Sequence, residues 1–285
     1  MEVILMHGGP LDQTPGQRLW LFSGTGDGPP LVRELLQQGW QLCVSVVTAE
    51  ASRPYNRHPR LELRVGPLGG SEALRLALEA AQRQGRPFTA VIDATHPFAT
   101  QIQRQLQVAC QQAGVPLLGL ARQSATGLDP QPPVTWLERL ENLASAELAG
   151  ARLLLAIGAR HLALAVHSSP GAVHHARLLP RPAALQLALA AGLDPGRLAC
   201  LQPLALASGV EAALVRRWRI EAIVARQSGP PTERLWRRIA AEQGCRLLLL
   251  RQPQSLATAQ RYSRLELLAQ LAAHQRRQIH LGAGT

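Results

Sequence analysis

Short apolar runs alternate with amphipathic helical patterns along this chain, and this alternation is the strongest constraint on its fold. A short aliphatic or β-branched run suits a strand buried on both faces, and strands that alternate with helices through short loops form a parallel sheet. The predicted strands are 18–22, 40–47, 61–65, 89–92, 115–120, 152–157, 172–178, 198–201, 220–225 and 245–250. The predicted helices are 31–39, 72–84, 98–110, 183–191, 209–218, 232–243 and 264–274. The chain is therefore predicted to be an α/β protein.

The alternation is interrupted once, at 127–133, where the sequence GLDPQPP is rich in turn-forming residues, and then it restarts. A chain of 285 residues is long enough for two domains of about 100–150 residues each. We expect a first domain over 18–132 and a second over 133–285, which look like two copies of one architecture without a repeat at the level of residues.

The first 17 residues are expected to be a flexible leader on a cytoplasmic protein, because Glu2 stands where a signal peptide carries positive charge. The longest apolar run, 153–166, contains Arg160 and His161 and is shorter than a membrane helix, so no membrane partner is expected. The four cysteines are widely spaced within apolar patterns, which favours buried free thiols over a zinc site or disulfides.

The net charge is +11, and all 30 basic residues are arginine, since the chain contains no lysine. The lack of lysine excludes a P-loop lysine, a Schiff-base lysine and a Tyr-x-x-x-Lys catalytic pair. Because the arginines are dispersed and aromatic residues for base stacking are scarce, we expect no nucleic-acid partner. An anionic small molecule fits this composition, since arginine pairs bidentately with carboxylate and phosphate.

A glycine-rich turn follows the first predicted strand and leads into a helix that starts with proline. Glycines let a backbone approach a phosphate, and the free N–H groups at a helix start attract an anion. The spacing is Gly-x-Gly-x-Gly instead of the dinucleotide pattern GxGxxG, so a phosphate cradle and an ordinary structural turn remain equally good interpretations. The candidate phosphate-binding residues are Ser23, Gly24, Thr25, Gly26 and Asp27.

The end of the second strand decides the nucleotide in dinucleotide folds: an acid there binds the ribose of NAD, and an arginine binds the 2′-phosphate of NADP. Glu50 is a candidate for the first role, and Ser52 with Arg53 for the second. We favour NADP. The alternative is an exposed loop ahead of Pro54.

The stretch Asp93-Ala94-Thr95-His96-Pro97 places a carboxylate, a hydroxyl and an imidazole at the carboxyl end of a buried strand, where open parallel sheets bind ligands. The alternative is that Asp93 and Thr95 only cap the next helix and that His96 is a solvated loop residue.

Strand-end loops in the second half supply further candidates for an anionic ligand. Gly158 follows one strand and Gln202 another, while Arg226, Ser228 and Gly229 follow a third. His174 and His175 share a strand, so their rings should point to opposite faces and should not bind one metal.

With these motifs, the chain resembles the precorrin-6A reductases, including the cobalt-precorrin-6A form, of corrin-ring biosynthesis. The resemblance runs from about Leu19 to Pro253, and the stretch 93–99 is its most specific part. The segments 24–28, 66–70 and 176–180 also match the family's pattern. The chain departs from that pattern at 201–204 and in the loop 226–231.

The resemblance implies two Rossmann-like domains with parallel sheets that face each other across a cleft. It implies that NADPH binds the N-terminal domain and delivers hydride to a ring double bond of a polycarboxylate tetrapyrrole bound on the side of the second domain. It implies no metal for the chemistry, so any cobalt belongs to the substrate, and it makes neighbouring corrin-pathway enzymes candidate partners. With the strand-end arguments above, the predicted catalytic residues are His96, Asp93 and Thr95. The predicted cofactor-binding residues are Ser23, Gly24, Thr25, Gly26, Asp27, Ser52, Arg53, Thr95, His96, Pro97 and Arg122. The predicted substrate-binding residues are Gly158, Arg177, Gln202, Arg226, Ser228 and Gly229.

Two alternatives remain from the residues alone. A dihydrodipicolinate-type reductase shares a faintly similar strand-end motif and a histidine pair, but its chemistry wants a nearby lysine, which this chain lacks. A non-catalytic protein that binds a nucleotide or tetrapyrrole would present the same loops without turnover.

Overall fold

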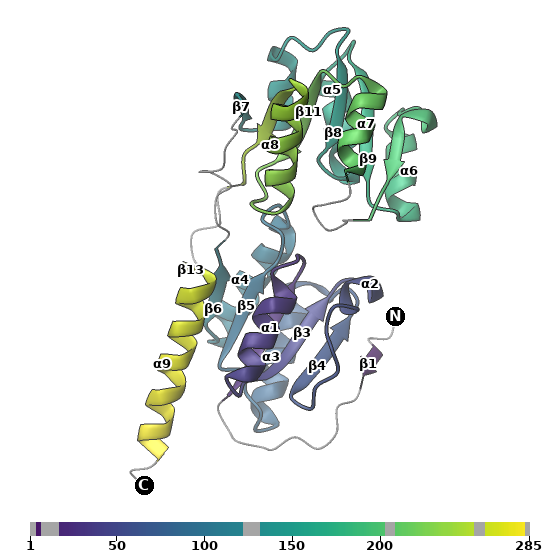
Figure 1. Cartoon of the computed structure of the whole chain (residues 1–285). Helices are drawn as coiled ribbons and strands as arrows, with labels where there is room; N and C mark the ends of the chain where they lie inside the picture. The colour runs from purple at the N-terminus through teal and green to yellow at the C-terminus, as the bar shows by residue number, and fades with distance from the viewer. Residues whose placement is uncertain (1–3, 7–16, 122–131, 203–208, 254–259, 283–285) are drawn as a thin grey trace. The chain divides into compact units, whose positions relative to one another are not determined.

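The computed structural model describes residues 4–6, 17–121, 132–202, 209–253 and 260–282, which fold into two compact α/β units (Figure 1). The first unit comprises Met1–Ala121 together with Pro253–Thr285, and the second comprises Arg122–Gln252. The predicted boundary 133–285 is therefore wrong at its C-terminal end. The reason is that the last strand and helix of the chain pair and pack with the first sheet.

The first unit is built on a sheet of seven strands in the order β1-β4-β3-β2-β5-β6-β13. All neighbours are parallel except β1, which pairs antiparallel with β4. Counted from β2, the six parallel strands have the order 3-2-1-4-5-6 of a doubly wound dinucleotide fold. The strands are β1 (Ile4–Met6), β2 (Arg18–Ser23), β3 (Gln41–Val46), β4 (Leu61–Val65), β5 (Ala90–Ala94), β6 (Leu117–Leu120) and β13 (Gln260–Tyr262).

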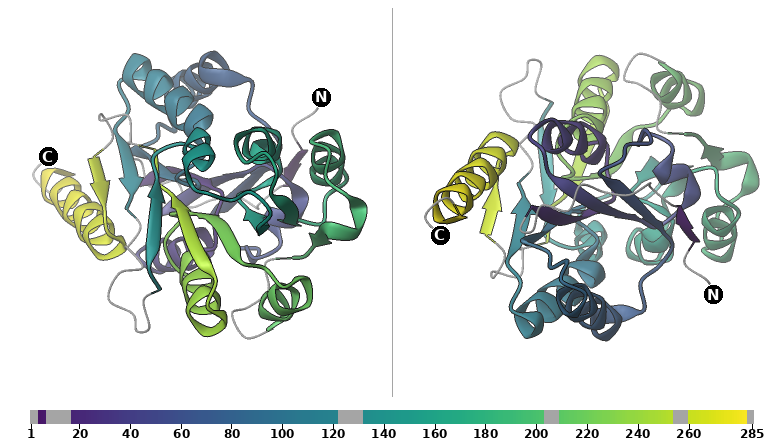
Figure 2. Two further views of the ribbon diagram at one scale, coloured as in Figure 1. Left: turned by 90° about the horizontal axis from the view of Figure 1, so that it is seen from above. Right: turned by 90° about the horizontal axis from the view of Figure 1, so that it is seen from below.

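Helices cover both faces of this sheet, with α3 and α4 on one face and α1 on the other (Figure 2). Alternate residues of β2 point to opposite faces, so Leu19 and Leu21 pack under α1 while Trp20 and Phe22 pack under α3 and α4. The helices are α1 (Gly28–Gln37), α2 (Ala49–Ser52), α3 (Gly70–Arg83), α4 (Thr100–Ala113) and α9 (Arg264–Gly282).

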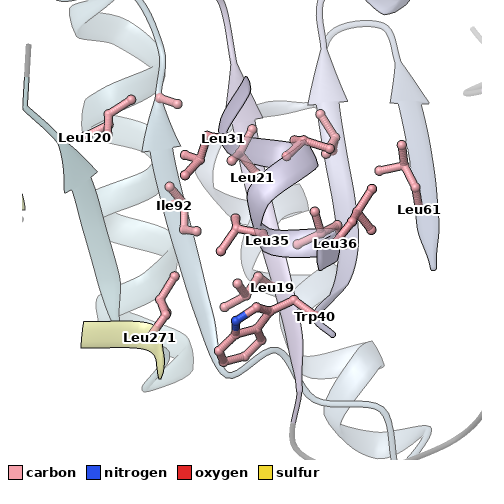
Figure 3. Close-up of a cluster of buried hydrophobic side chains, with 14 of the residues drawn as sticks. Leu19, Leu21, Leu31, Leu35, Leu36, Trp40, Leu61, Ile92, Leu120 and Leu271 are labelled. Atoms are coloured by element: carbon pink, nitrogen blue, oxygen red, sulfur yellow. The ribbon is translucent and has the colours of Figure 1, made fainter. Parts of the chain in front are cut away.

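The C-terminal helix α9 is part of this core. It begins with reciprocal capping, since the Ser263 N–H donates to Oε2 of Glu266 at 2.8 Å and the Glu266 N–H donates to Oγ of Ser263 at 3.3 Å. Leu267 and Leu271 are buried in the same cluster as Leu19 and Leu35 (Figure 3). The segment thus belongs to the first unit although it comes last in the sequence.

The second unit repeats the same strand order. Its six parallel strands run β10-β9-β8-β11-β12-β7, which is 3-2-1-4-5 counted from β8, with β7 in the sixth position. The strands are β7 (Val134–Leu137), β8 (Arg152–Ala156), β9 (Val173–Leu178), β10 (Leu198–Cys200), β11 (Ala222–Arg226) and β12 (Arg246–Leu250). The helices are α5 (Leu162–Ser168), α6 (Pro182–Ala190), α7 (Val210–Trp218) and α8 (Thr232–Gln243).

The structure confirms the ten predicted strands and corrects several details. Strands β1, β7 and β13 and helices α2 and α5 are additional, and α4 begins at Thr100, three residues after Pro97. Because β1 pairs with β4, the expectation of a flexible leader is wrong for residues 4–6. Three cysteines are buried free thiols, whereas Cys200 is exposed. Within the described ranges, no helix has the length and apolar character needed to cross a membrane.

Candidate functional site

The two predicted motifs of the first unit meet where the strand order of its sheet reverses. Strands β2 and β5 are neighbours there, and a crevice outside the carboxyl ends of such strands is the ligand position of doubly wound folds. The glycine turn follows β2 and the Thr95–His96 loop follows β5. A Cβ on Gly24 would lie 3.4 Å from the backbone nitrogen of His96, so glycine permits close packing of the two loops.

The glycine turn is held by its own side chains. The Asp27 N–H donates to Oγ1 of Thr25 at 3.4 Å, and the Thr25 hydroxyl donates to Oδ2 of Asp27 at 3.2 Å. Because the next two residues after Gly28, Pro29 and Pro30, have no N–H, the first turn of α1 offers an anion fewer donors than a usual helix start. The Gly28 N–H also donates within the turn, to the Thr25 carbonyl at 3.3 Å, so the amides of 24–26 are the candidate donors to a phosphate.

Tyr55 is a member of this site that sequence reasoning missed. Its buried hydroxyl donates to Oγ of Ser23 at 2.6 Å, and burial raises the pKa of the phenol. A Cβ on Gly28 would overlap both Ser23 and the Tyr55 hydroxyl, so this glycine is required for close packing. No sequence signal indicated the contact, because Tyr55 lies in an irregular segment after α2.

Asp93 organises the loop after β5. Its carboxylate is buried, and Oδ1 accepts the Thr95 N–H at 3.0 Å and the Thr95 hydroxyl at 2.6 Å. The alternative in which Asp93 and Thr95 cap the next helix is wrong, since α4 has Ala99 at its N-cap and no side-chain cap. The carboxylate instead fixes the backbone that presents His96.

His96 is held by two neighbours. Its Nδ1 accepts the Phe98 N–H at 3.2 Å, which leaves the ring proton of a neutral imidazole on Nε2, and the ring lies 5.8 Å from that of Phe98. The Gln103 side-chain amide donates to the carbonyl of His96 at 3.3 Å. The half-buried ring is thus a positioned group at the end of β5, and Pro97 behind it is buried.

The candidate 2′-phosphate residues lie at the end of α2, just after β3. Ser52 donates its hydroxyl to the Ala49 carbonyl at 2.7 Å, so this hydroxyl is used within the helix. Arg53 is exposed at the C-cap, and Glu50 lies in the first turn of the same short helix. Arg122, the remaining predicted cofactor residue, lies outside the described residues.

The second unit has its own reversal of strand order, between β8 and β11. Gly158 follows β8 with φ of +85°, and a Cβ there would lie 2.6 Å from a guanidinium nitrogen of Arg226 at the end of β11. Burial lowers the pKa of Arg226 to about 10, so the side chain remains charged at neutral pH. The pKa of nearby His161 is lowered by burial and by the charges of Arg226 and Arg160.

Two predicted substrate residues, Arg177 and Gln202, contact each other directly. Nη2 of Arg177 donates to the Gln202 carbonyl at 3.2 Å and lies 3.5 Å from Oε1 of the buried Glu211. The charge of Arg177 is therefore paired within the unit, and this arginine holds the strand-end loop in place.

Ser228 and Gly229 lead into α8 beside an ion pair that the sequence did not reveal. The Gly229 N–H donates to Oε2 of Glu233 at 3.0 Å. Oε1 of Glu233 accepts from Nε and Nη2 of Arg237 at 2.9 and 2.8 Å, and both side chains are almost completely buried. This pair fixes the backbone at Gly229, while the Ser228 side chain is itself buried.

Comparison with known proteins gives consistent matches. A family profile described as precorrin-6x reductase CbiJ/CobK matches residues 18–273, which include parts of both units and strand β13. The cobalt-precorrin-6A reductase of Synechocystis sp. (strain ATCC 27184 / PCC 6803 / Kazusa) is 31% identical over 242 residues, which cover 84% of this chain and 89% of that protein. The precorrin-6A reductase of Mycobacterium tuberculosis (strain ATCC 25618 / H37Rv) is 30% identical over 246 residues, which cover 83% and 89%.

A solved structure described as "CobK precorrin-6A reductase" is similar over 90% of this chain and 97% of its own, with a TM-score of 0.70 and 25% sequence identity. A match of this extent spans both α/β units, so the two-unit architecture is shared with that protein.

Proposed function

This chain belongs to the precorrin-6x reductase family, and on that basis we propose that it uses NADPH to reduce a ring double bond of precorrin-6A or cobalt-precorrin-6A. It is an oxidoreductase of cobalamin biosynthesis with a tetrapyrrole substrate. The observation that carries the cofactor assignment is the meeting of the glycine turn and the Thr95–His96 loop at the reversal of a doubly wound sheet.

The residues of the first unit fit a nicotinamide dinucleotide. Gly24 lets the turn pack against the backbone of His96, and Gly28 leaves room for Ser23 and Tyr55. The amides of 24–26 lie at the strand end where a pyrophosphate binds in such folds. When bound, the cofactor supplies the hydride for the reduction. The chain's own part is to bind it, orient it and exclude water.

The choice of NADPH over NADH rests on Arg53. Its exposed guanidinium follows β3 at the position that reads the 2′ substituent in dinucleotide folds, and it can pair with a phosphate in two hydrogen bonds. Glu50, on the same short helix, is the residue that would favour NADH.

The second unit is proposed to hold the carboxylates of the tetrapyrrole. Ionised carboxylates that enter a crevice lose hydration and need cations or N–H donors. Arg226 supplies a partly buried cation at the strand reversal, with the Gly158 backbone close to its guanidinium. Arg177 and Gln202 shape the adjoining loop through their mutual hydrogen bond.

His96 is proposed to position the cofactor or substrate and not to transfer the proton that completes the reduction. Its Nδ1 is occupied by the Phe98 N–H, so a neutral ring can donate to a ligand only through Nε2. The same family relationship leaves the cytoplasmic location and the neighbouring corrin-pathway enzymes as predictions.

The test is to mix the purified protein with NADPH or NADH and with metal-free or cobalt-bound precorrin-6A, and to follow the reduced nicotinamide by absorbance. We expect oxidation that requires a tetrapyrrole and is faster with NADPH. Tight binding of both compounds without oxidation would show a binding protein instead, and equal rates with NADH would overturn the cofactor choice.

A further inference from the structure

Strand β13 carries Arg261, whose side chain extends past Gly119 of β6 to Asp93 of the candidate site. In the first sheet Asp93 of β5 lies beside Gly119 of β6, and Gly119 lies beside Arg261 of β13. Residues opposite one another on neighbouring strands carry their side chains on the same face. Since Gly119 has no side chain, Arg261 can extend over β6 toward Asp93.

The contacts of Arg261 follow this line. Its Nη2 lies 3.8 Å from Oδ2 of Asp93, and its Nη1 donates to the Leu120 carbonyl at 3.4 Å. A Cβ on Gly119 would lie only 2.7 Å from Cγ of Arg261, so any larger residue at 119 displaces the arginine. The carboxylate of Asp93 is 4% exposed and therefore depends on partners inside the protein.

The two oxygens of Asp93 have different tasks. Oδ1 holds the N–H and hydroxyl of Thr95, and Oδ2 faces Arg261. We propose that Arg261 is a positioning residue, which fixes the rotation of the Asp93 carboxylate and through it the Thr95–His96 loop at the cofactor crevice. This role rests on the proposed function, because the loop acts on the reaction only if the crevice binds the dinucleotide.

Under this proposal Arg261, although far from Asp93 in the sequence, is part of the candidate site of the first unit. Gly119 is also required, because its lack of a side chain leaves room for the Arg261 side chain to cross β6. Substitutions at Arg261 and Gly119 should therefore have non-additive effects. A double-mutant cycle measures this coupling and distinguishes the positioning role from independent packing effects.

The experiment compares Arg261→Ala, Gly119→Ala and the double variant with the wild type. Two readouts are used: the dissociation constant of NADPH by fluorescence, and hydrogen exchange of the backbone around Thr95 by mass spectrometry. We expect each single variant to weaken NADPH binding by about threefold to tenfold and to speed exchange at Thr95. In the double variant, Gly119→Ala should add nothing, because no Cγ remains to be displaced.

The matched control is Arg264→Ala in the same segment, which loses an exposed ion pair with Glu34 and should leave both readouts unchanged. Arg261→Lys keeps the charge but replaces the guanidinium, whose two nitrogens reach Asp93 and the Leu120 carbonyl, so it should weaken NADPH binding less than Arg261→Ala does. Gly119→Ala tests the proposal if Arg261→Ala does not fold. The proposal is overturned if Arg261→Ala leaves exchange at Thr95 unchanged, or if the effects of the two substitutions add.

Failure of the proposed function gives a result different from failure of the proposed role of Arg261. The wild type would then bind no NADPH, while the exchange readout would still report whether Arg261 holds the Asp93–Thr95 contact.

Discussion

The two units have the same strand order but present different chemistry where that order reverses. In the first unit the loops after β2 and β5 offer glycine amides, hydroxyls and an imidazole, with the carboxylate of Asp93 buried behind them. In the second unit the corresponding strand ends, β8 and β11, bring the guanidinium of Arg226 against Gly158. The fold therefore gives each unit a strand reversal, and the residue types at the strand ends differ between the two units.

The units also differ in the origin of the sixth strand. In the first unit β13 comes from the end of the chain, whereas in the second unit β7 precedes the other strands. The first unit is thus discontinuous in sequence, and the chain passes between the units twice.

The largest expected effect tests this discontinuity. Leu267 of α9 is completely buried in the core of the first unit, so Leu267→Ala should lower the free energy of unfolding by about 2–5 kcal/mol. Leu265, on the same helix, is 81% exposed, and Leu265→Ala should change stability by no more than about 0.5 kcal/mol. Urea unfolding monitored by circular dichroism compares the two. Equal small effects would mean that α9 is not part of this core.

The C-terminal segment also shows what the sequence could not predict. The ten predicted strands were identified because each is a short apolar or alternating run with a local signal, including the alternating β4 and the edge strand β10. Strands β7 and β13 are short edge strands, and β13 pairs with β6, a partner far away in the sequence. Their assignment depends on tertiary contacts and not on local pattern, so the domain boundary was misplaced.

The residues of the candidate site also fall into two groups, those with a local sequence signal and those recognised only from tertiary contacts. The residues at strand ends were predicted from position and chemistry, and the structure places Gly24 against the backbone of His96. Tyr55, Glu233 and Arg261 were missed because each acts through a contact with a residue that the pattern does not link to it. Whether the predicted residues bind the cofactor and substrate stays a prediction.

The next prediction concerns the cation of the second crevice. Arg226→Ala should raise KM for the tetrapyrrole by about thirtyfold, with a smaller change in kcat, because a charged hydrogen-bond donor to a carboxylate is lost. The KM for NADPH should not change if the two crevices are specialised as proposed. Steady-state kinetics with each substrate varied in turn measures both constants, and an unchanged KM for the tetrapyrrole would show that Arg226 does not contact it.

The pH dependence sharpens the same comparison. The lowered pKa of Arg226, about 10, leaves the group charged in both the folded and the unfolded protein at neutral pH, so it adds no slope to stability there. Above about pH 10 the folded protein has lost this proton while the unfolded chain still holds it, so stability should rise with pH there on account of this group. KM for the tetrapyrrole should accordingly be flat from about pH 6 to 9.

Arg226→Lys is the matched variant. It keeps the charge at neutral pH and should retain most activity, but burial lowers the pKa of a lysine from an ordinary value of about 10.4. The KM of this variant should therefore begin to rise at a lower pH than that of the wild type. Identical pH profiles for the two proteins would argue against a buried role for residue 226.

A smaller effect is expected at the nucleotide end of the first crevice. Arg53 is exposed, so water screens its pairing, and Arg53→Ala should raise KM for NADPH by about tenfold while it leaves KM for NADH nearly unchanged. Glu50→Gln provides the contrast, since it should weaken NADH binding if Glu50 reads the ribose. Equal losses with both cofactors in Arg53→Ala would assign the preference to a residue other than Arg53.

The smallest effect is expected at His96, because we propose that this residue positions a ligand and does not act as a general acid. A general acid contributes about 10²–10⁴-fold to a rate. The amide oxygen of asparagine can accept the Phe98 N–H in place of Nδ1, so His96→Asn should keep the loop and lower kcat by less than about tenfold, with the pH dependence retained. His96→Ala loses that acceptor and should be the more damaging change.

The measurement is kcat against pH for both variants with saturating cofactor and tetrapyrrole. A loss of a hundredfold or more in His96→Asn, together with loss of the pH dependence, would identify His96 as the proton donor and would make the first crevice the source of both hydride and proton.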